Sequence, residues 1–298
     1  MALRINQNVQ STISQFHLKR NDDAMTASIN RLSTGLRVNR SGDDTAALNI
    51  SERMRNQVRG QDQAASNAQD AHNMLGTAEA ALNETHAILS RMRELVVQGA
   101  SDTLTDSDRT SIQGELDQLS SEVDRIGAKT EWNSHKLLNG DQSGTNGFTI
   151  QVGFRDGDIH TIAIRDMQAS ALSVDASNIT VQSNALASVS LTKLDKAIEE
   201  VSKERDYLGA HMNGLAQNIA TLNVDAQNQA SSENKLRDVD FAKEASRLTR
   251  AQLLQQSSTA MLAQANSQPQ AVLGLLRCRG RHSGAVPEQH SGAAAAKC

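Results

Sequence analysis

The sequence AASNAQDAHNMLGTAEAALNETHAILSRMRELVVQ, which runs from Ala64 to Gln98, decides the fold. It contains no proline, one glycine and no aromatic residue, so it can form one long α-helix. Its apolar positions recur in steps of four and three, the seven-residue repeat of helices that pack side by side. The repeat occupies positions 64, 68, 71, 75, 78, 82, 85, 89, 92 and 96. A helix of this length requires partner helices of similar length.

The apolar stripe of this helix is wider than a single repeat. Met74, Ala81, Ile88 and Leu95 form a second row beside the first, with a spacing of seven residues. A stripe of this width indicates contact with more than one neighbouring element.

Two other segments carry the same repeat and are the expected partners. The first spans residues 112–126 and is expected to fold back antiparallel on the opening helix after a turn at residues 99–109, with Asp106 or Ser107 as its N-cap. The second spans residues 194–226, where nine of the ten repeat positions are apolar. The residues predicted to pack the rods together are Leu75, Leu82, Leu89, Met92, Val96, Leu116, Leu119, Val123, Leu208, Leu215, Ile219 and Leu222.

The middle of the chain changes period. In FTIQVGFRDGDIHTIAI, which begins at Phe148, apolar and polar residues alternate on both sides of Asp156–Gly157. Alternation interrupted by a turn dipeptide predicts a β-hairpin. Residues 170–188 are rich in serine, asparagine and alanine and show only a weak pattern.

The two ends of the chain are weakly apolar helices. The pattern of residues 1–34 predicts an amphipathic helix. Such a helix is only marginally stable alone in water, so we expect it to be disordered until a partner covers it. The sequence SGDDTAA then supplies a break, with Asp43 or Asp44 as the cap of the next helix. A last helix is expected over residues 238–268, with its end near Pro269. An outermost helix pair with so small a core is a natural surface for self-assembly.

Composition excludes several classes of protein. The 298 residues carry a net charge of −4 without a basic patch, so the sequence does not indicate nucleic-acid binding. No apolar run approaches the length of a membrane span, and the N-terminus lacks the apolar segment of a secretory signal peptide, which alone would favour a cytoplasmic protein. The two cysteines are Cys278 and Cys298, so no disulfide framework is expected in the body of the chain.

The sequence also offers no enzyme site. The eight histidines form no HExxH motif or metal-ligand pair, and no phosphate-binding loop follows a strand. The paired carboxylates of Asp43 and Asp44 fit a helix cap better than acid–base catalysis. We therefore expect no catalytic residue, no metal and no cofactor.

Several long motifs occur in an order that resembles bacterial flagellin. They include RLSTGLRVN, DDTAALNISERMRNQVRG, NAQDAHNMLGTAEAALNE, MRELVVQGAS, NIATLNVDAQNQASSENKLRDVDFAKEAS and QQSSTAMLAQANSQPQAVLGLLR, and the resemblance covers residues 1–277. It implies a mainly α fold of long antiparallel, coiled-coil-like rods. In that fold the N- and C-terminal segments are paired and a small β-hairpin region lies in the middle.

The resemblance also implies an organisation and a function. Residues 1–44 and 237–277 would form an inner tube of the flagellar filament, with Ile5, Val9, Ile13, Phe16, Leu273, Leu275 and Leu276 as its assembly residues. Residues 45–187, with a short variable segment at about 165–187, and residues 188–236 would form the surrounding rods. The chain would assemble with copies of itself for swimming motility. Its export, unfolded and without a cleaved signal, would use the flagellar type III system, with an export chaperone and a filament cap as further partners and an extracellular destination.

A second implication of the resemblance is recognition of the monomer by Toll-like receptor 5 in an animal host. The family's receptor motif matches LSRMRELVVQ and the facing helix, which carries the contact over to Arg91, Leu95 and Glu115, with Ile88 beside them. The alternative for these residues is simple packing and solvation. For the whole chain, the alternatives are the hook–filament junction protein of the same superfamily and a non-flagellar coiled-coil scaffold.

The last residues depart from the family pattern. Residues 278–298, CRGRHSGAVPEQHSGAAAAKC, follow the point at which flagellins end and hold both cysteines. We expect a disordered tail there, and its bulk is expected to hinder packing of the inner tube.

Overall fold

The computed structural model describes residues 8–281, with the side chains of Thr145, Pro269 and residues 271–281 left undescribed. The chain divides into two compact units. The terminal unit comprises the described residues up to Glu52 and from Glu233 onward, and the rod unit comprises Arg53–Ser232. The predicted fold class is confirmed, because long paired helices dominate and the strands of the described residues are short, antiparallel and confined to the middle of the chain.

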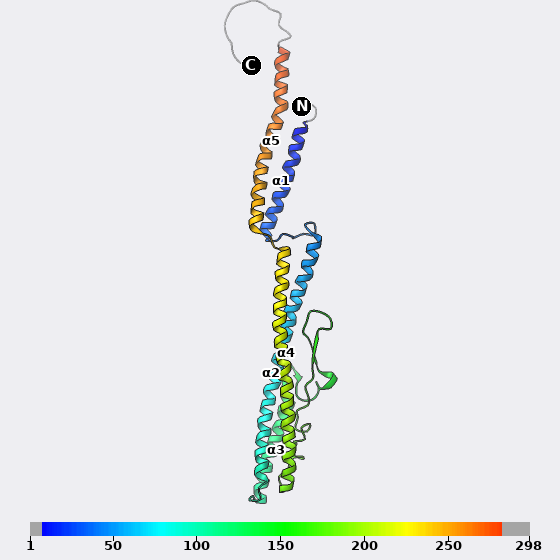
Figure 1. Cartoon of the computed structure of the whole chain (residues 1–298), viewed down its shortest axis with the longest axis vertical. Helices are drawn as coiled ribbons and strands as arrows, with labels where there is room; N and C mark the ends of the chain where they lie inside the picture. The colour runs from blue at the N-terminus through cyan, green and yellow to red at the C-terminus, as the bar shows by residue number, and fades with distance from the viewer. Residues whose placement is uncertain (1–7, 282–298) are drawn as a thin grey trace, which may run out of the picture. The chain divides into compact units, whose positions relative to one another are not determined.

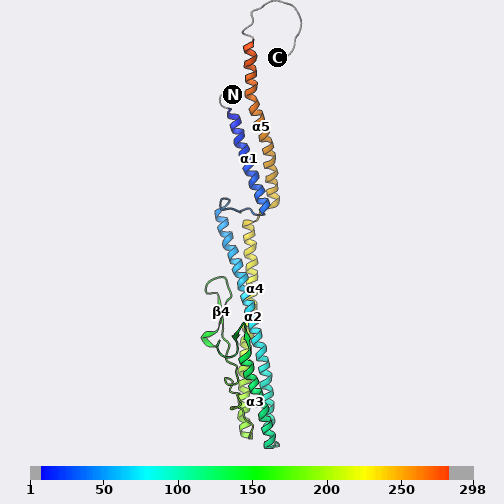
Figure 2. The ribbon, with the colours of Figure 1, turned by 180° about the vertical axis from the view of Figure 1, so that it is seen from behind.

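The terminal unit contains helices α1 (Val9–Thr34) and α5 (Phe241–Arg281), which lie side by side in both views (Figures 1 and 2). Helix α1 begins after Asn8, whose side-chain oxygen accepts a hydrogen bond from the Ser11 backbone N–H at 3.1 Å. It ends at Gly35, where a φ of 71° favours glycine. The partner that the N-terminal helix needs is therefore supplied by the C-terminal helix of the same chain.

Helix α5 corrects one prediction. It continues through Pro269 to Arg281, whereas the sequence analysis ended it near the proline, and residues 278–281 of the expected disordered tail are thus helical. Proline has no N–H, so the Ala265 carbonyl four residues earlier loses its helical donor. The side-chain amide of Asn8 donates to that carbonyl at 2.8 Å instead. Residues 282–298 lie outside the described residues.

The rod unit is built from α2 (Thr45–Gly99), α3 (Asp106–Lys129) and α4 (Asn184–Arg237), of which α2 and α4 extend beyond it. The three helices run alongside one another (Figures 1 and 2). Among the described residues no helix is both long enough and apolar enough to cross a membrane.

The helix caps are confirmed in one case and corrected in the other. The Asp44 carboxylate accepts from the Ala47 N–H at 2.9 Å, so Asp44 caps α2 as predicted. The cap of α3 is Thr105 rather than Asp106 or Ser107. Thr105 and Asp108 bond to each other's backbone N–H groups, a reciprocal pair that neither predicted residue could form from its position.

The predicted β-hairpin is confirmed as β3 (Phe148–Gln151) and β4 (Ile159–Ile162), with Phe148 opposite Ile162. A shorter antiparallel pair, β1 (Glu131–Trp132) and β2 (His135–Lys136), follows α3. A 3₁₀ turn, Gly144–Asn146, precedes β3.

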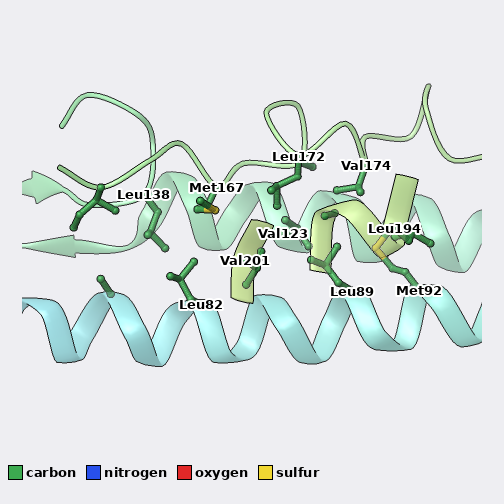
Figure 3. Close-up of a cluster of buried hydrophobic side chains, with 14 of the residues drawn as sticks. Leu82, Leu89, Met92, Val123, Leu138, Met167, Leu172, Val174, Leu194 and Val201 are labelled. Atoms are coloured by element: carbon green, nitrogen blue, oxygen red, sulfur yellow. The ribbon is translucent and has the colours of Figure 1, made fainter. Parts of the chain in front are cut away.

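The core of the rod unit lies where all three helices meet the irregular segment after the hairpin. Figure 3 shows Leu82, Leu89 and Met92 of α2 facing Val123 of α3 and Leu194 and Val201 of α4. Met167, Leu172 and Val174 close the same cluster from the irregular segment, and Leu138 from the loop after β2 (Figure 3). The weakly patterned stretch of the sequence thus contributes to the core although its residues 170–183 form neither helix nor strand, and only its last residues, from Asn184, belong to α4.

Candidate functional site

The contact between α1 and α5 is made by small and polar side chains. Ser11 and Ser28 are the buried residues of α1. The Ser11 hydroxyl donates to the Asn266 side-chain oxygen at 2.8 Å, and the Ser28 hydroxyl donates to the Glu244 carboxylate at 2.8 Å. Glu244 is only 2% exposed, while Ala251 and Ala265 fill the space along α5. Among the described side chains of α1 and α5, no large apolar residue is fully buried, and Leu18, Leu248 and Leu262 are half-buried.

Large apolar side chains lie on the outside of the same two helices. Phe16 is 65% exposed and Leu253 is 63% exposed. We call the exposed large apolar residues of α1 and α5 the outer stripe: Val9, Ile13, Phe16 and Ile29 on α1, and Phe241, Leu253, Leu254 and Met261 on α5. Val9, Ile13 and Phe16 follow one another in steps of four and three, so they share one face of α1, and a contiguous apolar face left exposed is typical of an interaction surface.

The predicted inner-tube residues are only partly described. Val9, Ile13 and Phe16 belong to the outer stripe. Ile5 lies outside the described residues, and Leu273, Leu275 and Leu276 lie in α5 with undescribed side chains. Their role in assembly stays a prediction.

The residues predicted to pack the rods lie in or against the core of the rod unit. Nine of them are at most 2% exposed: Leu75, Leu82, Leu89, Met92, Val96, Leu116, Val123, Leu208 and Leu215. Leu222 is buried at 8% exposure, and Leu119 and Ile219 pack partly buried against the cluster.

The predicted receptor residues fall into two environments. Arg91 of α2 and Glu115 of α3 form an exposed ion pair at 2.9 Å, and Glu94 accepts a further hydrogen bond from Arg91 at 3.2 Å. The hydrogen bonds from Arg91 to Glu115 and then Glu94 raise the pKa of the guanidinium. Ile88 lines a groove of about 460 Å³ between α2 and α3. Leu95, by contrast, is 2% exposed and belongs to the core.

Comparison with known proteins decides the family. A model of the bacterial flagellin N-terminal helical region matches residues 5–143, and one of the C-terminal helical region matches residues 191–276. The chain belongs to the bacterial flagellin family. Flagellin from Halalkalibacterium halodurans is 41% identical over 275 residues, 92% of this chain and 99% of that relative. Flagellin FlaB2 from Treponema pallidum is 42% identical over 284 residues, 92% of this chain and 99% of its own.

Membership of the flagellin family gives the coarse function. The chain is a structural subunit of a flagellar filament and not an enzyme. It is a flagellin with a short variable region, because its relatives match almost end to end and only residues 144–190 lie between the two family regions. A flagellar hook-associated protein from Vibrio parahaemolyticus has a similar fold, with a TM-score of 0.55 over 66% of this chain and 100% of the other. At 17% identity that likeness concerns the fold alone.

The structure also brings together residues that the sequence analysis did not single out. His160 on β4 and His211 on α4 have facing ring nitrogens 2.8 Å apart, and the Tyr207 ring lies against His211. Within residues 8–281 no group of three or more histidine, cysteine, aspartate or glutamate side chains is arranged to hold a metal ion. The contact between Glu244 and Ser28, which are 216 residues apart, also could not be predicted from apolar periodicity, because both residues are polar.

Proposed function

We propose that copies of this chain polymerise through the outer stripe. In the filament, the outer stripe would be buried between neighbouring copies in the wall of the inner tube. The observation that supports this most strongly is the inversion of the terminal unit, with buried Ser28 and Glu244 inside and Phe16 and Leu253 outside. Burying exposed apolar side chains between copies contributes about 25 cal/mol per Å² of apolar surface removed from water. A lone terminal unit cannot obtain that stabilisation.

In this proposal the terminal helices up to residue 44 and from residue 237 to 277 form the inner tube. The rods at 45–187 and 188–236 form the shell around it. The division is supported by the contrast between the polar contact of α1 with α5 and the apolar core that joins α2, α3 and α4.

The test of the assembly surface is seeded polymerisation of the purified chain, followed by sedimentation and negative-stain electron microscopy. Phe16→Ser and Leu253→Ser should reduce the sedimented fraction severalfold, because each removes exposed apolar area from the proposed interface. Gln15→Ser, at an exposed polar position of α1, is the matched control and should assemble like the parent. Normal filaments from both stripe variants would contradict the proposal.

We also propose export through the flagellar type III system, with an export chaperone and a filament cap as partners. The polar, weakly apolar terminal helices support it, because a segment with so little core unfolds at low cost. Export predicts that the chain appears outside the cell with a mass equal to that of its full sequence, and only while the flagellar export apparatus is intact. Secretion that continued without the apparatus would contradict the proposal.

The monomer is further proposed to bind Toll-like receptor 5 through the exposed pair Arg91 and Glu115, with Ile88 beside them. Receptor signalling by Arg91→Ala should fall at least about tenfold, which corresponds to ~1.4 kcal/mol of binding free energy. The control is Arg93→Ala, because Arg93 is equally exposed on α2 and forms a comparable pair with Asp195 at 2.7 Å. Wild-type potency of Arg91→Ala would remove the assignment.

Leu95 requires a separate measurement because its side chain is buried in the rod unit. We propose that it acts by holding Arg91, one helical turn earlier, in place. Leu95→Ala should therefore lower both thermal stability and receptor signalling. Lost stability with unchanged signalling would exclude Leu95 from recognition.

A further inference from the structure

Hydrogen bonds run along the entire contact between α1 and α5. From the N-terminal end of α1, Asn8 donates to the Ala265 carbonyl at 2.8 Å and Ser11 to Asn266 at 2.8 Å. Asn21 donates to the Ser258 hydroxyl at 2.9 Å, and Gln255 donates to the Asp22 carboxylate at 3.3 Å. Ser28 and Glu244 form the last bond at 2.8 Å. From Asn8 and Ser11, which bond to the neighbouring Ala265 and Asn266, to Ser28, which bonds to Glu244, the partners run back along α5 as α1 advances, so the five bonds fit one antiparallel pairing.

Glu244 is the member of this row that tolerates displacement least. Its carboxylate accepts from Ser28, lies 3.0 Å from the Arg247 guanidinium and lies 3.6 Å from that of Arg31. Burial opposes its ionisation, but the bonds from Ser28 and Arg247 and the nearby positive charges outweigh burial and lower the pKa of the carboxyl group. A slide of one helical turn, about 5.4 Å, would separate Glu244 from Ser28 and Arg31. Only Arg247, on the same helix, would remain, and a buried carboxylate that loses its other partners is disfavoured.

Asn8 fixes the opposite end of the pair. Its side-chain oxygen caps α1 through Ser11, and its side-chain nitrogen donates to the Ala265 carbonyl that Pro269 leaves without a helical donor. Pro269 is the one proline of α5, so in the interior of the helix the missing N–H leaves only the Ala265 carbonyl without its donor. Asn8 therefore recognises a specific position along α5 rather than a generic helix surface.

Apolar packing between α1 and α5 could not define a register by itself. The fully buried apolar residues described on α5 are the small Ala251 and Ala265, whereas Leu248 and Leu262 are only half-buried and Leu253 and Met261 are more than 60% exposed. Small side chains leave shallow ridges, so a slide along the helix changes little apolar burial. A single buried polar residue can specify the register of paired helices.

We propose that Glu244 and Asn8 are positioning residues that set the register of α1 on α5 and thereby compose the assembly surface. The proposal rests on the proposed function, because the outer stripe is shared between the two helices. The correct register fixes the position of the outer-stripe residues of α1 along the helix axis relative to those of α5. A slipped pair would present the same residues in a different arrangement to the next copy.

Disulfide trapping measures the register directly. In a parent carrying Cys278→Ser and Cys298→Ser, Asn21→Cys with Ser258→Cys reports the observed register. Asn21→Cys with Ala251→Cys reports a slip of one heptad. Cross-linked fractions are measured by mass spectrometry in monomers and in seeded filaments. The parent should bridge only the first pair.

Glu244→Ala should lower the yield of the in-register bridge severalfold, produce the slipped bridge and reduce filament yield. Asn8→Ala should act in the same direction. The control is Asp23→Asn, which removes one exposed carboxylate from α1 and should change neither bridge. In-register bridging of Glu244→Ala at the parent level would overturn the proposal.

If Glu244→Ala prevents α1 and α5 from pairing at all, Glu244→Gln distinguishes that loss of pairing from a loss of register. Glutamine retains an acceptor for Ser28, so it should restore in-register bridging to at least half of the parent level. Bridging no better than that of Glu244→Ala would also overturn the proposal. Failure of the parent to form filaments, with in-register bridges intact in the monomer, would count against the proposed function and not against the register.

Discussion

The His160–His211 pair is the clearest pH-sensitive contact at the scale of single residues. One ring must donate and the other accept across 2.8 Å, which requires at least one neutral imidazole. Burial, and then the charge of His160, lowers the pKa of His211 from its ordinary value of 6.5. The pair joins the hairpin strand β4 to the rod helix α4, so its protonation acts on hairpin docking.

We predict that the rod unit loses stability as the pH falls below 6.5, the unperturbed pKa of histidine. The unfolded chain binds the proton more readily than the folded chain, so stability present above 6.5 declines as the pH falls toward the lowered pKa of His211. The effect should be below ~1 kcal/mol because the ring is partly exposed. Thermal unfolding at pH 7.5 and 5.5 measures it. His211→Gln should flatten the dependence and His72→Gln should not, and a profile unaffected by His211→Gln would refute the assignment.

Gly147 tests the close approach of the loop before β3 to the end of β4. A Cβ atom at this position would lie 2.7 Å from the Ile162 carbonyl oxygen, a backbone atom that cannot rotate away. Gly147→Ala should therefore destabilise the rod unit by about 1–3 kcal/mol. Gly114→Ala, with nothing within 4 Å, should stabilise it by about 0.5–1 kcal/mol. Urea unfolding compares the two, and equal effects would contradict the geometry.

At the scale of elements, the start of α3 depends on its reciprocal cap. Thr105→Ala removes the side-chain acceptor for the Asp108 N–H and should cost about 1 kcal/mol. Ser107→Ala, at a position that the sequence also offered as a cap, should cost much less. Chemical denaturation of the two variants distinguishes them. A larger loss for Ser107→Ala would place the cap where the sequence analysis placed it.

The long helices could be predicted from sequence because a seven-residue repeat reports directly which face is buried. Leu82, Leu89 and Leu215 occupy such positions and lie in the core. The segment after the hairpin could not be predicted in this way. Val174, Ile179 and Val181 are fully buried there, but the backbone is irregular, so no period links their positions.

The terminal unit was harder to predict for a different reason. Its buried residues include Ser28 and Glu244, and its exposed residues include Phe16, which reverses the usual relation between polarity and burial. The helix end at Pro269 was mispredicted because the donor that compensates for the missing N–H, Asn8, is 257 residues away in sequence from Ala265. Such a contact has no local signal.

At the scale of the whole molecule, the two units differ in how they are stabilised. The rod unit has an apolar core, whereas the terminal unit depends on polar contacts. We predict two unfolding transitions for the monomer by circular dichroism, with the terminal unit melting first. Leu89→Ala should lower the free energy of unfolding of the rod unit by about 2–5 kcal/mol. Only the later transition should therefore move to lower temperature. A single transition, or a change in the earlier one, would contradict this division.

The most direct measurement of the central claim is amide hydrogen exchange of α1 and α5 in the monomer and in seeded filaments. If assembly buries the outer stripe, exchange over residues 9–34 and 241–268 should slow by about tenfold or more on polymerisation. The α2 segment 75–96 should be protected in both states. Filaments in which α1 and α5 exchange as fast as they do in the monomer would contradict the claim that this chain assembles through its terminal helices.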